Sequence, residues 1–254
     1  MTSSTNSSSR GSDSYGRGLP FLAAAACVVL TAGFGLAVFY APSDLDQGLI
    51  QKIFYLHVPL AIVTLGGFVA GGVFAIGHLR TGDRRWDVRS YVSIHLSLVL
   101  GVAVLLTGAI WARASWGIWW EWKEPTLVSF LVVFLLYATY QPLRFSIEDP
   151  ERQGRYASVF AITAGAFVPL NFMAVRMAEP LIHPRVFAAA GSGLEGSMWL
   201  TFLVCLTGMA LLFVTLWKYE MTSKHAAQQL RALRRALAGE EPRAESRTAA
   251  PSVS

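Results

Sequence analysis

The sequence predicts an all-α integral membrane protein of six transmembrane helices with both termini in the cytoplasm. Hydrophobic residues make up 54% of the 254 residues and charged residues only 15%, which is more apolar than a soluble domain usually is. Six nearly uncharged runs have the length, about 20 residues, that crosses a bilayer as a helix. Lys and Arg are also distributed unevenly between the loops. A helix is expected in each run because lipid requires every backbone donor and acceptor to be paired within the segment.

The six predicted spans divide the chain almost evenly. The first is longer than the core of a signal peptide and no A-x-A-like cleavage site follows it, so we expect it to be retained. The flanking segments lack the apolar residues that form a core. The predicted spans are residues 19–40, 58–79, 92–111, 127–143, 157–175 and 198–217. The predicted organisation is a disordered cytoplasmic N-terminus (1–18), a membrane domain (19–217) with an outer tryptophan-rich loop (111–125), a basic cytoplasmic helix (218–238) and a disordered tail (239–254).

The distribution of positive charge predicts the orientation. Of the 21 Lys and Arg residues, 16 lie in the termini and in the second and fourth loops, and the first, third and fifth loops hold the other five. Cytoplasmic loops of membrane proteins are enriched in Lys and Arg, so both termini are expected inside. The formal charge of +5 follows from this asymmetry and from attraction to anionic membrane lipid, and it requires no nucleic acid partner.

The third loop contains an unusual concentration of tryptophan. Five of the eight tryptophans lie at or just beyond the predicted outer interface, at Trp111, Trp116, Trp119, Trp120 and Trp122. An aromatic belt at the headgroup level is one interpretation. The number of tryptophans in one short, partly charged loop favours a flat apolar platform near water, which suits stacking of a large planar ligand.

Two of the five histidines lie on the same predicted side as these tryptophans. His57 ends the first outer loop and His183 lies in the last one, each close to a proline. A single interface histidine is more often a hydrogen-bonded packing residue than a ligand. Two that flank the aromatic loop favour a ligand role, and neutral imidazole is a good axial ligand for haem iron. His78 and His95 fall near cytoplasmic helix ends and His225 lies in the tail.

The sequence lacks the motifs of several other chemistries. Cys27 and Cys205 are isolated within predicted helices, so we expect no thiol redox pair, no cysteine-rich metal site and no thioether attachment of haem. No GxxxxGK[ST] motif is present, which argues against ATP hydrolysis. The stretch GGFVAGG at 66–72 has the spacing of close helix packing. Asn171, two residues after Pro169, is expected to form a hydrogen bond either with the backbone group that the proline leaves unpaired or with a neighbouring helix.

The motif WGxWWxW at residues 116–122 resembles the signature of the WWD-domain haem-handling proteins of cytochrome c maturation. The chain as a whole resembles the haem exporter protein C (CcmC) family. FYLHVPLA around His57, VPLNFMAV in the fifth span and LIHP around His183 are similar to that family's segments and occur in the same order. The resemblance covers residues 19–217 and leaves both polar tails unaccounted for.

The resemblance implies a multi-pass protein of the bacterial cytoplasmic (inner) membrane that holds haem b non-covalently at its outer face and presents it to a periplasmic haem chaperone. It also implies an ABC ATPase with its permease and a small single-span membrane protein as companions. Axial ligation of the iron would fall to His57 and His183. No independent enzyme activity is expected, because no acid, base or nucleophile is arranged for bond-making. The other residues that the resemblance places around haem are Trp116, Gly117, Trp119, Trp120 and Trp122.

The sequence departs from the family pattern at the end of the tryptophan motif. Lys123 stands where the family usually has Asp, and Glu124 and Pro125 follow in place of a basic residue. Met177 and Ala178 replace an aromatic pair. These changes indicate a divergent member or a different contact with the chaperone.

The cations of the outer loops suggest a role for Lys123, which stands in place of the family Asp. Haem propionates are anionic, so a cation at the edge of the platform would favour them. Lys123 is the first candidate, and Arg113, Arg176 and Arg185 could serve equally. The alternative is a lysine that only extends from the interface toward water.

Two other classes of function stay open at this point. The permease subunit of an ABC-type transporter would need polar groups along a path, but the spans are almost wholly apolar apart from His95, Gln141 and Asn171. A structural subunit of a membrane complex would need the tryptophans only as anchors.

Overall fold

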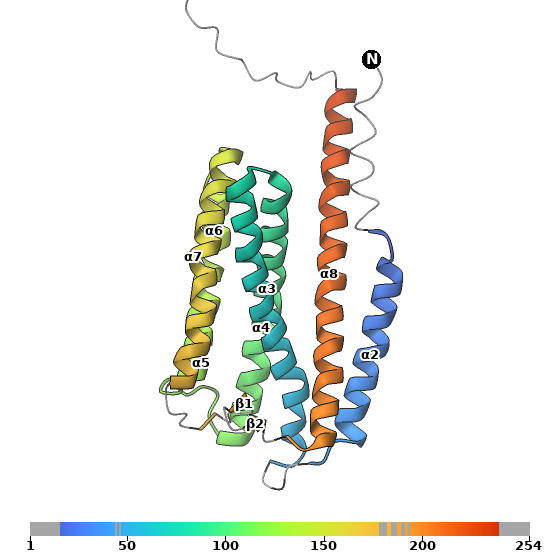
Figure 1. The fold of residues 1–254 in the computed structure, drawn as a ribbon, viewed down its shortest axis with the longest axis vertical. Coiled ribbons are helices and arrows are strands. Elements are labelled where there is room, and N and C mark those ends of the chain that lie inside the picture. The colour runs from blue at the N-terminus through green and yellow to red at the C-terminus, as the bar shows by residue number, and fades with distance from the viewer. Residues whose placement is uncertain are drawn as a thin grey trace, which may run out of the picture. The chain divides into compact units, whose positions relative to one another are not determined.

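The computed structural model describes residues 16–43, 45, 47–177, 182–183, 187–188, 191–192 and 194–238. Six helical stretches within these residues are long and apolar enough to cross a membrane, which confirms the predicted all-α class with six spans (Figure 1). A two-residue strand pair is the minor addition, with β1 (Phe187–Ala188) antiparallel to β2 (Gly191–Ser192). The helices are α2 (Leu19–Phe39), η1 (Leu49–Ile53, a 3₁₀ helix), α3 (Phe54–Thr81), α4 (Arg84–Trp116), α5 (Pro125–Ala138), α6 (Tyr140–Phe145), α7 (Pro150–Met177) and α8 (Gly196–Leu237).

Several helices extend beyond the predicted apolar runs because their ends are capped by polar residues. The Asp83 carboxylate accepts a hydrogen bond from the Arg85 amide at 2.8 Å and starts α4. Gly117 ends the same helix in the left-handed conformation with φ 77°, which glycine adopts without a steric penalty. The first part of the predicted tryptophan loop, 111–116, is therefore helical. The placement of His57 at the end of a loop was wrong, since it lies in the first turn of α3.

The chain divides into two compact units, residues 18–217 and the terminal segments on either side. Within the described part of the second unit, the Lys218 ammonium donates to the Arg17 carbonyl at 2.9 Å. Lys224 and Glu220 form an i,i+4 ion pair at 3.1 Å. The predicted basic stretch 218–238 is helical as far as Leu237, as a continuation of α8, and its cytoplasmic location stays a prediction. The predicted tail 239–254 and the first 15 residues lie outside the described part.

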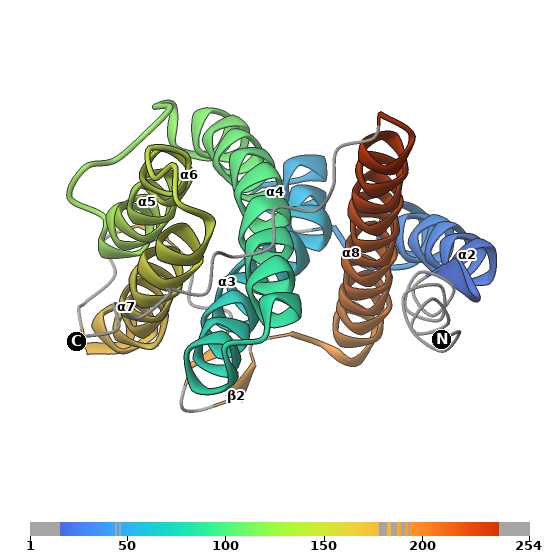
Figure 2. The ribbon, with the colours of Figure 1, turned by 90° about the horizontal axis from the view of Figure 1, so that it is seen from above.

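Within residues 18–217, α3 and α4 lie between α5–α7 on one side and α2 with α8 on the other (Figures 1 and 2). The expected close packing at 66–72 is confirmed. A Cβ added to Gly67 would overlap Ser97 of α4, and one added to Gly71 would lie 2.5 Å from Ile94 of α4. On the other face of α3, the rings of Phe68 and Tyr137 of α5 stack at 4.0 Å. The small residues of α3 therefore allow it to contact its neighbours closely, as in other membrane bundles.

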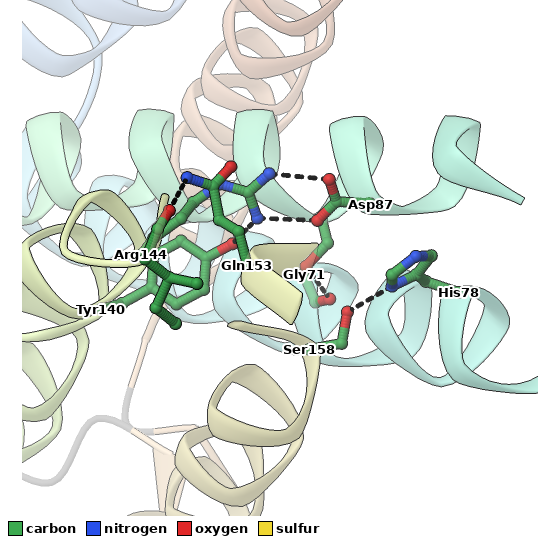
Figure 3. Close-up of polar contacts among 9 residues, drawn as sticks. Gly71, His78, Asp87, Tyr140, Arg144, Gln153 and Ser158 are labelled. Atoms are coloured by element: carbon green, nitrogen blue, oxygen red, sulfur yellow. Dashed lines mark hydrogen bonds and ion pairs between the residues drawn. The ribbon is translucent and has the colours of Figure 1, made fainter. Parts of the chain in front are cut away.

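A buried polar cluster closes the end of the bundle formed by the end of α3 and the start of α4 (Figure 3). The Arg144 guanidinium donates to both Asp87 oxygens at 2.7 Å and to the Tyr140 hydroxyl at 3.2 Å. Close by, His78 Nδ1 and the Ser158 hydroxyl are 2.8 Å apart and join α3 to α7. Arg144 is one of the cations of the predicted fourth loop, but in the structure it lies in α6 and is a buried ion-pair partner of Asp87.

Candidate functional site

The opposite end of the bundle encloses a cavity of about 410 Å³. It lies between the start of α3, the end of α4, the start of α5, the end of α7 and His183, and its walls are almost entirely apolar. Its size falls in the range of small-molecule binding sites. The lining includes both predicted histidine ligands and three of the five clustered tryptophans, namely His57, His183, Trp111, Trp116 and Trp120.

His57 is held in the cavity wall by a hydrogen bond to α4. Its Nδ1 lies 2.9 Å from the Thr107 hydroxyl oxygen, and the same hydroxyl donates to the Ala103 carbonyl at 2.8 Å. With its one proton directed to the Ala103 carbonyl, the hydroxyl accepts from Nδ1–H of His57. In this arrangement Nε2 carries the lone pair, which is the form that ligates a metal.

The imidazole of His57 fits against α4 only because residue 108 is glycine. A Cβ added to Gly108 would lie 2.9 Å from Cε1 of the His57 ring, which is closer than ordinary van der Waals contact. Gly108 itself lines the cavity. The sequence analysis did not identify either Thr107 or Gly108, since both look like ordinary residues of a membrane helix.

His183 lies against the tryptophans at the end of α4. Its ring meets Trp111 at 6.0 Å and Trp116 at 6.2 Å, with interplanar angles of 65° and 72°. The two indoles meet each other edge to face at 4.8 Å. These rings form a corner around the imidazole, which differs from the flat platform that the sequence suggested.

The remaining tryptophans of the motif are divided between the cavity and the surface. Trp120 lines the cavity, whereas Trp119 and Trp122 are 60% and 72% exposed and lie outside its lining. Trp122 contacts the Trp120 ring at 6.0 Å. A Cβ added to Gly117 would meet nothing within 4 Å. Glycine is therefore needed there for the left-handed backbone conformation and not for lack of space.

The four candidate cations have different surroundings. Lys123 is exposed, and the Arg113 guanidinium donates to the Gly117 carbonyl on the surface. Arg176, in the last turn of α7, lies 5.0 Å over the ring of Phe172, which lines the cavity. Arg185 falls outside the described residues.

Glu124 is a buried carboxylate that the sequence analysis noted only as a departure from the family pattern. It is 0% exposed and caps α5 by accepting from the Thr126 amide at 3.4 Å. Its other oxygen accepts from the amides of Ile182 at 3.0 Å and His183 at 3.2 Å. An acidic residue before proline is a typical helix start, but the link to residues 182–183 has no sequence signal.

Two polar atoms of the cavity-lining side chains have no hydrogen-bond partner within the described part of the chain. They are Nε1 of Trp120, a donor, and Oδ1 of Asn171, an acceptor, and both are buried. The expected pairing of Asn171 with backbone or a neighbouring helix is not made by this oxygen. Buried polar groups without partners are uncommon in native proteins, so these atoms indicate a ligand with polar groups of its own.

A cluster of metal-ligating side chains would indicate another kind of metal site in the described part of the chain. No group of three or more His, Cys, Asp or Glu side chains that could hold a metal ion is found there. Cys27 and Cys205 are both free. The donor set at the cavity is therefore two imidazoles within apolar and aromatic walls.

Together the fold and the cavity define a class of protein, a multi-pass α-helical membrane protein with a histidine- and tryptophan-lined binding cavity at one end of the bundle. Comparison with known proteins identifies the family. Residues 2–236 match the family model described as "Heme exporter protein C", and the chain belongs to this family. The match reaches into both terminal segments, beyond the 19–217 covered by the resemblance.

Named relatives support the assignment. The chain is 31% identical over 218 residues to heme exporter protein C of Bradyrhizobium diazoefficiens, covering 85% of this chain and 82% of the relative. It is 27% identical over 220 residues to that of Rhodobacter capsulatus, covering 86% and 90%. For Escherichia coli K12 the identity is 32% over 152 residues, covering 60% and 62%. With six candidate spans and bacterial relatives, this is a multi-pass protein of a bacterial inner membrane.

Proposed function

We propose that this protein binds haem in the cavity and delivers it to a periplasmic haem chaperone for cytochrome c maturation. The observation that carries the proposal is that His57 and His183, distant in the sequence, line one cavity with Trp111, Trp116 and Trp120. Family membership supports haem as the cargo. Haem b, bound without covalent attachment, is consistent with a sequence that has two free cysteines and no CxxC motif.

The cavity residues suit haem in three respects. The tautomer of His57 presents the Nε2 lone pair to a metal, and His183 supplies a second imidazole, so the iron would be held axially by both. The aromatic corner and the aliphatic wall offer a large apolar surface for a porphyrin and exclude water. The unpaired Trp120 Nε1 and the Arg176 guanidinium near Phe172 offer hydrogen bonds and charge to carboxylates. Three further cations of the outer loops could pair with the haem propionates at the edge of the cavity. They are Lys123, Arg113 and Arg185.

We also propose that the cavity end faces the periplasm and that both termini are cytoplasmic. Positive charge in the terminal segments and in the loops of the opposite end supports this orientation. A membrane-impermeant thiol reagent on intact cells should label a cysteine placed at Trp122 and not one placed at Arg152, in a chain without Cys27 and Cys205. The opposite pattern would reverse the orientation.

The proposed partners follow from the family assignment and from the exposed part of the motif. Trp119 and Trp122 extend from the cavity rim and are available to the periplasmic haem chaperone. An ABC ATPase, its permease and a small single-span protein complete the expected assembly. No independent enzyme activity is proposed, because the chain's own groups hold and orient the cargo without an arranged acid, base or nucleophile.

The absorption spectrum of the purified protein tests the proposal. Protein expressed with ample haem should show a low-spin Soret and α/β pattern that is lost in His57→Ala and in His183→Ala. His95→Ala is the matched control, because His95 pairs with Gln141 at 2.8 Å and does not line the cavity. A haem-free wild type that still assembles with its partners would favour the structural-subunit or permease alternative.

A further inference from the structure

Glu124 occupies an unusual position beside the haem cavity. Its side chain is completely buried, yet it does not line the cavity. A buried carboxylate is costly unless hydrogen bonds compensate for the lost hydration. Glu124 accepts from more backbone amides than a helix cap needs, which indicates a role beyond capping α5.

The geometry shows that one carboxylate joins two segments that are distant in the sequence. One oxygen accepts from Thr126 at the start of α5, and this bond alone would make a normal N-cap. The other oxygen accepts from the consecutive amides of Ile182 and His183. The backbone of His183 is thus fixed directly to the chain that follows the tryptophan motif.

Fixing the amide of a ligand residue restricts where its side chain can lie. The imidazole of His183 contacts Trp111 and Trp116 on the side of the cavity formed by α4. Residues 182–183 are not helical, whereas His57 lies within α3 and is bonded to Thr107 of α4. The Glu124 carboxylate supplies for His183 the restraint that helical structure and Thr107 supply for His57.

We propose that Glu124 is a positioning residue that holds the backbone of His183 where its imidazole, together with that of His57, would ligate haem iron. The inference rests on the proposed haem function. Mutation of a residue that is hydrogen-bonded to a metal ligand typically lowers metal affinity about 10- to 100-fold. We expect this loss when the bond to the His183 amide is removed.

The test separates helix capping from the link to His183. Glu124→Asp keeps a good N-cap but shortens the side chain by one methylene, about 1.5 Å, so the carboxylate no longer reaches residues 182–183. Glu124→Ala removes both functions. Glu124→Gln keeps one oxygen that can accept from the Ile182 and His183 amides, but its NH2 group replaces the oxygen that caps α5. The matched control is Glu121→Ala, because the Glu121 carboxylate accepts from the Lys123 amide at 2.9 Å in the same loop.

Each purified variant is titrated with ferric haem while the Soret and α/β bands are recorded, and its apo form is melted in the same detergent. We expect Glu124→Asp to melt like the wild type but to bind haem about 10- to 100-fold more weakly, with the low-spin bands reduced as in His183→Ala. Added imidazole should restore the low-spin bands in both variants. Glu124→Gln should bind haem almost as the wild type does but melt at a lower temperature, because its NH2 group cannot cap α5, and Glu121→Ala should resemble the wild type.

The outcomes distinguish this inference from the proposed function. Wild-type affinity and low-spin bands in both Glu124→Asp and Glu124→Ala, with loss in His183→Ala, would overturn the positioning role alone. Low-spin bands that persist in His183→Ala would overturn the ligand assignment and the proposed function with it. If Glu124→Ala does not fold, the Glu124→Asp and Glu124→Gln pair still decides the question.

Discussion

Thr107 should control haem affinity although it does not line the cavity. Its hydroxyl accepts from Nδ1 of His57 at 2.9 Å and donates to the Ala103 carbonyl at 2.8 Å. Valine has the same shape without the oxygen. In Thr107→Val the Nδ1–H loses the oxygen that accepts from it, or the proton moves to Nε2 and blocks the position that binds iron.

The expected magnitude follows from either consequence. A buried donor left without its partner costs about 1–3 kcal/mol, and loss of an outer-shell partner lowers metal affinity about 10- to 100-fold. A tenfold change corresponds to about 1.4 kcal/mol, so the two ranges agree. We therefore expect the Kd for ferric haem to rise about 10- to 100-fold in Thr107→Val.

The assay is a Soret titration of the apoprotein in detergent with Thr107→Ser and Thr163→Val as controls. Serine keeps the hydroxyl and should bind almost as the wild type does. Thr163 is an exposed threonine of α7 whose hydroxyl bonds only to its own helix, at the Val159 carbonyl, so its substitution should have no effect. A Thr107→Val protein that binds haem within about twofold of the wild type, against the tenfold minimum expected for a lost outer-shell partner, would refute the assigned tautomer and its role.

Two further predictions concern packing at the two ends of the bundle. Gly108→Ala should weaken haem binding at least about tenfold, as expected for a displaced ligand, because its Cβ would lie 2.9 Å from the His57 ring; Gly66→Ala, whose Cβ would meet nothing within 4 Å, is the control. Equal titration curves for these two variants would contradict the close fit. Asp87→Ala should lower the free energy of unfolding by about 3–5 kcal/mol, because it leaves Arg144 as a buried unpaired charge. Glu151→Ala, which removes an exposed ion pair with Arg155, should cost less than about 0.5 kcal/mol, and comparable melting temperatures for the two would show that the buried pair contributes little.

Sequence reasoning located the spans because lipid demands long apolar runs, but it placed the helix ends less well. The first residues of α4, such as Arg84, and interfacial residues such as Trp116 are helical but lie outside the long apolar run, so hydropathy stops short of them. The same limit put His57 in a loop and counted Arg144 as a solvated cation.

The candidate site shows a similar division. Residue types and topology were enough to identify His57, His183 and the tryptophan cluster, because these are unusual residues on one predicted side. Which indoles line the cavity depends on how the chain turns after Gly117, and this turn has no periodicity to read. The contacts of Thr107 and Glu124 could not be predicted, because these side chains form hydrogen bonds with residues far away in the sequence, at His57 and at 182–183.

The ion pair between Asp87 and Arg144 has a consequence for biosynthesis. The two residues are 57 positions apart, and α5 lies between their helices in the order of synthesis. While the ribosome is still making α5, the nascent α3–α4 hairpin carries a carboxylate whose guanidinium partner does not yet exist. Chains that stall or are truncated before α6 therefore carry an unpaired acid near the start of α4, and the buried pair can form only after α6 has been made.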